Sequence, residues 1–175
     1  MSELDLEPKI GKISTLLVDA EVDSLADRLS ILQIINLYSH LVDDFDPNHW
    51  AELFTEEARF EIRFGRGGPE DVTALDGRRA ILDVIMPRQM AFREACIQRR
   101  HYLTNPVVVE LVSKSARVMA YLMLASIHPE RGMEIEGTGR YDGVVVRTAA
   151  GWRIQSWRLT ADGRGEKLTN VVDPD

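Results

Sequence analysis

The sequence is poor in the features that mark several large classes of protein. One cysteine, Cys96, stands among 175 residues, so no internal disulfide can form and no cysteine pair has metal-ligand spacing. Acidic residues outnumber basic ones and give a formal net charge of -7. Nucleic-acid binding needs a basic surplus, so no nucleic-acid partner is expected. A single cysteine fits a reducing compartment, and we expect a cytoplasmic protein.

Long hydrophobic runs are also missing. The longest apolar run extends from Val118 to Ile127, far short of the roughly 20 residues that a membrane-spanning helix needs. The acidic start, MSELDLEPK, lacks the apolar core of a signal peptide, so no membrane partner is expected. The glycines of GRGGPED lack phosphate-loop spacing, and the histidines and acids lack zinc or iron spacing. We therefore expect no cofactor and no metal.

What is present predicts one α+β domain. Residues 1–22 are interpreted as an N-terminal arm, residues 23–162 as the domain and residues 163–175 as a C-terminal tail. The helices are expected first: from an N-cap at Ser24 to about Asp43, from Pro47 to Phe54, and over 77–95, which Pro87 ends or kinks.

The second half of the chain changes to strand-like runs. They are predicted at about 102–112, 115–127, 133–147 and 152–160, after one earlier strand at about 58–64. The last four are joined by short connections, which favours consecutive antiparallel hairpins. This order predicts helices packed on one face of a curved sheet.

Three polar residues are the candidates for chemistry. His101 stands at the mouth of the first long strand-like run, while Tyr38 and Asp43 lie near the C-terminal end of the first helix. An imidazole can accept a proton near neutral pH, a carboxylate can orient it, and a phenol can stabilise developing negative charge. Asn105 shares the strand face of His101 by the period-two rule.

Each candidate also has a purely structural interpretation. His101 could be a core histidine that donates to a main-chain carbonyl, and Tyr38 could simply pack on the apolar stripe of its helix. Asp43 could be a solvated acid at a helix end beside Asp44 and Asp46, and its spacing alone favours that interpretation.

Several spaced motifs resemble the SnoaL-like branch of the nuclear-transport-factor-2-like superfamily. They are Tyr38-x4-Asp43-x2-Asp46-x3-Trp50-x2-Leu53-Phe54-Thr55, His101-x3-Asn105, GRYDGVVVR and GWRI. The branch includes polyketide cyclases, scytalone dehydratase, bile-acid 7α-dehydratase and hexachlorocyclohexane dehydrochlorinase. The resemblance implies a cone-shaped α+β barrel, in which N-terminal helices and a strongly curved, mainly antiparallel sheet enclose a pocket.

The resemblance also implies roles for individual residues. Asp43, rather than Asp44, would pair with His101, which would abstract a proton while Tyr38 holds the substrate oxygen. The residues expected to bind substrate are Asn105, Trp157, Trp50 and Tyr121.

The GWRI strand departs from the pattern of the family. Several family enzymes place an arginine five residues after its tryptophan, but here Trp152 is followed at that distance by Trp157, and Arg158 comes next. Either the register shifts locally, or the pocket has an aromatic wall in place of a cation.

Two classes of function follow from these observations. The first is a cofactor-free lyase or isomerase of the dehydratase kind, acting on a small, mostly apolar molecule in an apolar pocket, in a homo-oligomer (dimer or trimer). The second is a non-catalytic protein: the small β subunit of an aromatic-ring-hydroxylating dioxygenase, or a ligand-binding domain with an inert pocket.

Overall fold

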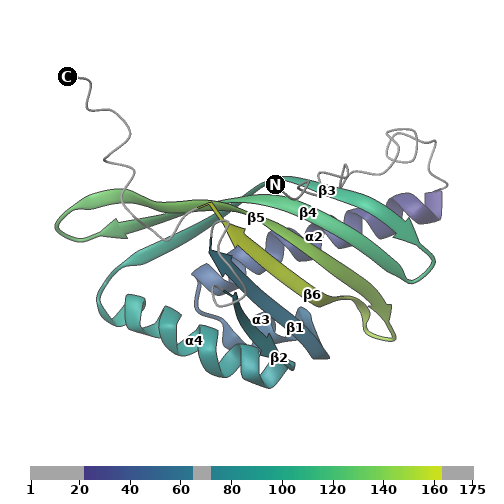
Figure 1. Ribbon diagram of the computed structural model, residues 1–175, viewed down its shortest axis with the longest axis horizontal. Coiled ribbons are helices and arrows are strands. Elements are labelled where there is room, and N and C mark those ends of the chain that lie inside the picture. Colours follow the sequence, from purple (N-terminus) through teal and green to yellow (C-terminus); the bar gives the residue numbers. More distant parts are fainter. Residues whose placement is uncertain (1–21, 65–71, 163–175) are drawn as a thin grey trace, which may run out of the picture.

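The computed structural model describes residues 22–64 and 72–162, which form one sheet with helices against it (Figure 1). The helices are α2 (Val22–Asp43), α3 (Pro47–Glu52) and α4 (Arg78–Glu94). The strands are β1 (Phe54–Phe64), β2 (Val72–Asp76), β3 (Gln98–Val112), β4 (Ser115–His128), β5 (Gly132–Thr148) and β6 (Gly151–Ala161). The expected tail and GRGGPED loop, and the expected arm up to residue 21, lie outside the described residues.

The strands confirm the predicted α+β class. Their order in the sheet is β2-β1-β6-β5-β4-β3. The four long strands β3 to β6 pair antiparallel in sequence order, as the short connections predicted. β1 joins the sheet parallel to β6, and the short strand β2, which the sequence did not reveal, extends it antiparallel to β1.

The sheet bends and stays open. Its ladders shift register at several irregularities, among them those between Thr104 and Val107 and between Leu124 and Ala125. Such bulges increase the local bend and twist of a strand. The two outer strands of the six are β2 and β3, so the predicted barrel is not closed, and β3 has a free edge within the described part of the chain.

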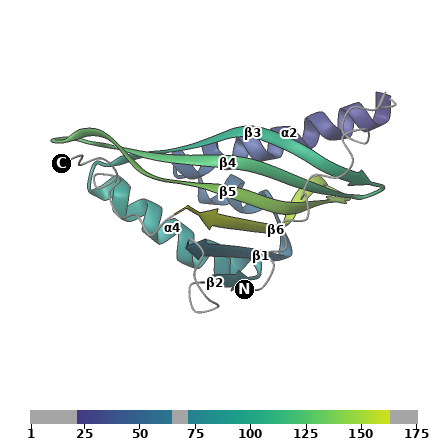
Figure 2. The ribbon, with the colours of Figure 1, turned by 45° about the horizontal axis from the view of Figure 1, so that its top comes forward.

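Helix α2 covers that free-edge side of the sheet. Figure 2 shows it next to β3, and in Figure 1 it passes behind the strands of the sheet. The helix begins at Val22, so Ser24 lies inside it and is not the N-cap that we expected. Leu25 and Leu29, near its start, are 51% and 61% exposed. The residues of α2 that enter the core are Ile31, Ile34, Ile35, Tyr38 and Val42.

Helix α4 does not end at Pro87. It runs unbroken from Arg78 to Glu94 with the proline inside. Proline removes the hydrogen bond to the carbonyl four residues earlier, which belongs to Asp83. Pro87 and Asp83 are both exposed. Water can therefore bond to the freed carbonyl, which explains why the helix continues.

None of the helices in the described part of the chain is both long enough and apolar enough to cross a membrane. The cytoplasmic location stays a prediction.

Arginines surround one carboxylate on the outer face of the sheet. Glu61 alternates with the core residue Phe60, so its side chain leaves the opposite face of β1. Its carboxylate accepts hydrogen bonds from Arg158 Nε at 2.7 Å, Arg59 Nε at 2.9 Å and Arg63 Nη2 at 3.3 Å. The Arg158 bond is the main reason why the pKa of Glu61 falls from 4.5 to about 2.

The lowered pKa predicts how the contribution of Glu61 to stability depends on pH. A carboxyl group that is more acidic in the folded state stabilises the fold above its unfolded pKa, and this contribution is lost as the pH falls. Glu61→Gln should therefore lower the free energy of unfolding by roughly 1 kcal/mol at neutral pH, a value limited by solvent screening. The difference should shrink as the pH falls from 4.5 to about 2.

Urea unfolding of both proteins across this pH range checks the prediction. Asp83→Asn, which removes an exposed ion pair of α4, is the control and should show a smaller effect. A Glu61→Gln deficit that stays constant down to the lowest pH would contradict the account.

Gly143 makes room for an aromatic ring in the core. It lies opposite Trp157 in the β5–β6 ladder. A Cβ at this position would lie 2.2 Å from Cε3 of Trp157 and 2.6 Å from the carbonyl oxygen of Ser156. Trp157 in turn stacks on Tyr141, with 4.9 Å between ring centroids. The absence of a side chain at Gly143 therefore fixes where the tryptophan lies.

Gly143→Ala should destabilise the protein by about 1–3 kcal/mol, because the indole must move out of a packed core. Gly137→Ala is the matched control on the same strand, since nothing lies within 4 Å of a Cβ built there. Thermal denaturation measures both variants. Equal melting temperatures for the two would show that the ring has freedom to move.

Candidate active site

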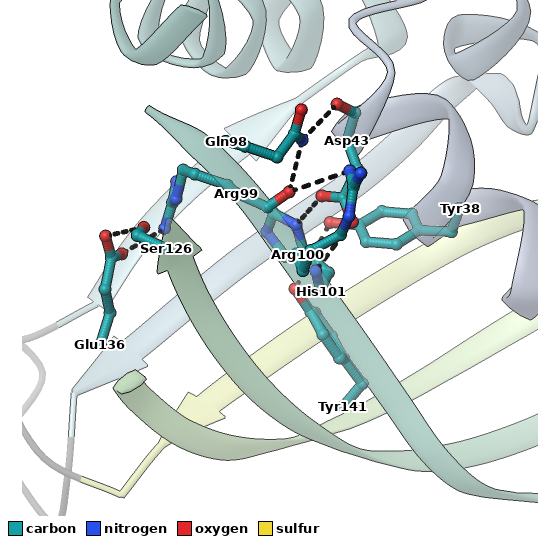
Figure 3. A network of polar contacts seen from close by, with 9 residues as sticks. All are labelled: Tyr38, Asp43, Gln98, Arg99, Arg100, His101, Ser126, Glu136 and Tyr141. Carbon is teal, nitrogen blue, oxygen red and sulfur yellow. Dashed lines mark hydrogen bonds and ion pairs between the residues drawn. The ribbon is translucent and has the colours of Figure 1, made fainter. Parts of the chain in front are cut away.

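Asp43 joins the end of α2 to the free edge of β3. It is the last residue of the helix, and its carboxylate contacts His101 twice (Figure 3). Oδ1 lies 2.5 Å from Nδ1 of the imidazole, and Oδ2 accepts the main-chain N–H of His101 at 2.9 Å. Gln98 Nε2 adds a bond of 3.2 Å to the main-chain carbonyl of Asp43. The carboxylate thus takes the place of a neighbouring strand at this point of the edge.

This geometry sets the chemistry of the imidazole. Both side chains are largely buried, with 8% of His101 and 7% of Asp43 exposed. When Nδ1 donates to a carboxylate, the neutral ring carries its proton there and leaves Nε2 as an acceptor. The neighbouring acids do not compete: Asp44 is exposed, and Asp46 bonds to Nδ1 of the exposed His49 at 2.6 Å.

Tyr38 meets a second phenol, Tyr141, in the core. Their hydroxyl oxygens are 3.4 Å apart, and both rings are buried. Burial raises the pKa of Tyr38 well above its usual value, and proximity to Tyr141 and Asp43 raises it further. Burial also raises the pKa of Tyr141 to about 12. At neutral pH both phenols keep their protons and can donate hydrogen bonds.

Aromatic rings fill the space around these phenols. Tyr38 lies 5.5 Å from Trp50 and 5.8 Å from Trp157 between ring centroids, and Phe54 also packs on the group. Trp157 is fully buried, whereas Arg158 points outward to Glu61, so the inner wall at this point is aromatic. The indole N–H groups of Trp50 and Trp157 are buried and have no hydrogen-bond partner within the described residues.

A buried arginine, Arg99, adds to the polar residues at this end of β3, and the sequence analysis did not predict it. Arg99 is 3% exposed, bonds to Glu136 Oε2 at 2.9 Å, and lies over the ring of Phe92 at 4.3 Å. Ser126, opposite Arg99 in the ladder, donates to the same carboxylate. Burial lowers the pKa of Arg99. The signal in the sequence was that Arg99 lies two residues before His101, which predicts the same strand face.

Two predicted substrate-binding residues lie elsewhere. Asn105 is exposed and has a φ of 51°, at the irregularity between Thr104 and Val107, so the period-two rule fails there. Tyr121 is 56% exposed and lies between the buried residues Ala120 and Leu122, so it points to the outer face of β4. The structure therefore does not bring either residue to His101.

A groove of about 610 Å³ lies between α2 and the edge of β3, and the Asp43–His101 pair opens into it. Its walls are mixed polar and apolar, unlike the apolar pocket that we expected. The lining residues are Gln33, Asn36, Leu37, Ser39, His40, Asp43, Asp44, Arg100, His101, Tyr102 and Leu103. Within residues 22–64 and 72–162, no group of three or more histidine, cysteine or acidic side chains could hold a metal ion.

Solved structures with the same architecture were found by comparison. An NTF2-like protein with a cystatin-like fold from Novosphingobium aromaticivorans has a TM-score of 0.68 and 20% identity, covering 80% of this chain and 84% of its own. A proposed scytalone dehydratase from that organism has a TM-score of 0.63 and 22% identity, covering 79% and 85%. The β subunit of a proposed aromatic-ring-hydroxylating dioxygenase, also from that organism, has a TM-score of 0.64 and 18% identity, covering 81% and 92%. At such identities these likenesses concern the fold alone.

No curated protein matches the sequence. The model of one family, described as the SnoaL-like domain, matches residues 23–158. This match spans most of the chain and agrees with the helix-and-meander fold and with its NTF2-like structural neighbours. The chain therefore belongs to the SnoaL-like domain family.

Proposed function

We propose that this protein is a cofactor-free lyase or isomerase, dehydratase-like in its chemistry, that acts on a small organic molecule. The observation that carries the proposal is the double contact between Asp43 and His101. One carboxylate oxygen orients the ring and stabilises the imidazolium that forms, while the other fixes the main chain. A histidine with a purely structural role would need neither two contacts with the same carboxylate nor a position beside an open groove.

The proposed reaction begins with proton transfer to Nε2 of His101 from a carbon next to a carbonyl. The C–H electron pair forms the C=C bond of an enolate, and the carbonyl pair moves onto oxygen. In an elimination, the enolate re-forms the carbonyl and its C=C pair moves to form the bond between the α and β carbons. The β-hydroxyl group, protonated by the imidazolium, leaves as water. In an isomerisation, the imidazolium returns the proton to a different carbon.

The buried phenols are the donors for an enolate oxygen that reaches the aromatic interior. The raised pKa of Tyr38 keeps its proton in place at neutral pH, so it can donate to an oxyanion. Tyr141 lies next to it and can orient its hydroxyl group. The unpartnered indole N–H groups of Trp50 and Trp157 are further donors for a substrate that reaches the aromatic interior.

Proton exchange tests the proposal without knowledge of the natural substrate. Enolisable ketones, such as 2-tetralone and phenylacetone, are incubated with the protein in D2O, and deuterium incorporation is followed by NMR. The wild type should exceed the His101→Ala variant by roughly 10²-fold or more, as positioned acid–base catalysis does. Asp43→Asn should also be slow, because its amide cannot hold the imidazole in the same tautomer.

The chain offers a matched control for this experiment. His49 forms a comparable bond with Asp46 but is exposed, so His49→Ala should exchange at the wild-type rate. Thermal denaturation of each variant separates lost chemistry from lost folding. Equal exchange by folded His101→Ala and wild type would refute the role of His101.

A second observation favours association with another protein chain, which we propose to be a second copy. Tyr102, Val107 and Tyr121 are exposed on β3 and β4, and Tyr121 lies opposite Thr104 in the ladder, diagonal to Tyr102. Large apolar groups gathered on one sheet face are typical of an interface. Both the homo-oligomer and the alternative of a non-catalytic subunit would use such a face.

Size-exclusion chromatography with light scattering tests this association. The chain alone should form a dimer or trimer, and Tyr121→Ser should shift it toward the monomer. Val84→Ser, which changes an exposed apolar residue on α4, is the control and should leave the mass unchanged. A wild-type monomer at all concentrations would contradict self-association and favour the subunit alternative.

A further inference from the structure

The groove beside α2 exposes the dyad along the free edge of β3. Four consecutive residues, from Arg100 to Leu103, line it, so it follows the edge and receives side chains from both faces of the strand. The N–H of His101 points to this edge, where Asp43 accepts it. In an antiparallel ladder the main-chain groups of Leu103 point the same way. The groove therefore offers main-chain as well as side-chain partners next to the imidazole.

Arg100 is the cation of this groove. It is partly buried, and its hydrogen bond among the described residues runs from Nη1 to the main-chain carbonyl of Arg99, at 3.4 Å. Within the described part of the chain, no carboxylate forms an ion pair with it, whereas Arg99 pairs with Glu136. Figure 3 shows the two side chains leaving β3 in different directions, Arg99 toward Glu136 and Arg100 toward the helix end that carries Asp43.

We propose that this groove binds the substrate of the reaction proposed above, on which this inference rests, and that Arg100 holds an anionic group of that substrate. The substrate class is then a small organic carboxylate with an acidic C–H bond. A guanidinium group presents two parallel N–H donors that match a carboxylate, and a partly buried one binds it more strongly than an exposed one. The volume of the groove suits a small ligand.

The charges of the groove set the orientation of such a ligand. Asp43 is engaged by His101, but Asp44 also lines the groove and would repel an anion. Arg100 is directed toward that same helix end, so its guanidinium group offsets this repulsion and holds the carboxylate group there. As His101 takes a proton, negative charge develops beside the guanidinium, which stabilises it. Arg100 thereby supplies on β3 the positive charge that was missing at the position of Trp157 on β6.

The aromatic interior is the competing location for a substrate. Trp50 and Trp157 are fully buried there, and the rings around Tyr38 pack against one another. A ligand must part these rings before it can enter. The groove needs no such rearrangement, and the indole N–H groups of the two tryptophans report which location a ligand takes.

A binding experiment with phenylacetate tests the proposal. The full-length 15N-labelled protein is titrated with phenylacetate and, separately, with the uncharged phenylacetamide. Phenylacetate should shift the amide signals of Leu37, His40 and Leu103 in a saturable way, and phenylacetamide should bind at least roughly tenfold more weakly. Arg100→Gln should weaken phenylacetate binding by a similar factor.

Two controls make the result specific. Arg140→Gln changes a half-buried arginine of β5 that lies opposite Tyr121, and it should bind like the wild type. The indole signal of Trp152, which donates to Asp27, should not move. Unchanged binding in Arg100→Gln, or shifts confined to the indoles of Trp50 and Trp157, would overturn the proposal.

Failure of this inference can be distinguished from failure of the proposed function. If the ketones exchange protons through His101 while phenylacetate does not bind the groove, the inference falls and the function stands. If phenylacetate binds through Arg100 but neither it nor any ketone exchanges protons, the anion site stands and its part in catalysis is overturned.

Discussion

The contact between Asp43 and His101 is the interaction on which the site depends. The two residues are 58 positions apart, one at the end of α2 and the other on the edge strand β3. One carboxylate satisfies an edge N–H that no other described strand pairs with, and it also fixes the imidazole. Structural stability and reactivity are therefore combined in a single side chain. An edge N–H left buried without a partner would cost free energy, so the helix end and the strand must stay together.

This contact lies on a boundary between two environments. On one side are the buried rings of Tyr38, Trp50, Phe54, Tyr141 and Trp157, with phenol and indole donors among them. On the other side is the polar groove that contains Arg100. An imidazole between an apolar interior and a cationic groove can accept a proton from a ligand on the groove side, while the charge that it gains faces Asp43. This boundary exists because β3 is an outer strand of the sheet.

The sequence allowed prediction of the features that repeat along the chain. The strands from β3 to β6 were recognisable because their alternating runs are long and their connections short. The pairing of Asp43 with His101 came from a spaced motif, since spacing alone favoured a solvated acid. Register irregularities prevented prediction of the other contacts. Asn105 leaves the strand face of His101 at the irregularity between Thr104 and Val107. Glu136 reaches Arg99 beside the irregularity between Leu124 and Ala125. The five-residue strand β2 is too short to show a periodic pattern.

The ring nitrogens of His101 offer the most direct test of the central claim, that Asp43 holds the imidazole with Nε2 free to accept a proton. A long-range 1H–15N correlation spectrum at mildly alkaline pH distinguishes the two neutral tautomers, and comparison with His101→Ala assigns the signal among the four histidines. The account predicts a proton on Nδ1 and none on Nε2, with loss of this preference in Asp43→Asn. A proton on Nε2 in the wild type, or an equal mixture of tautomers, would contradict it.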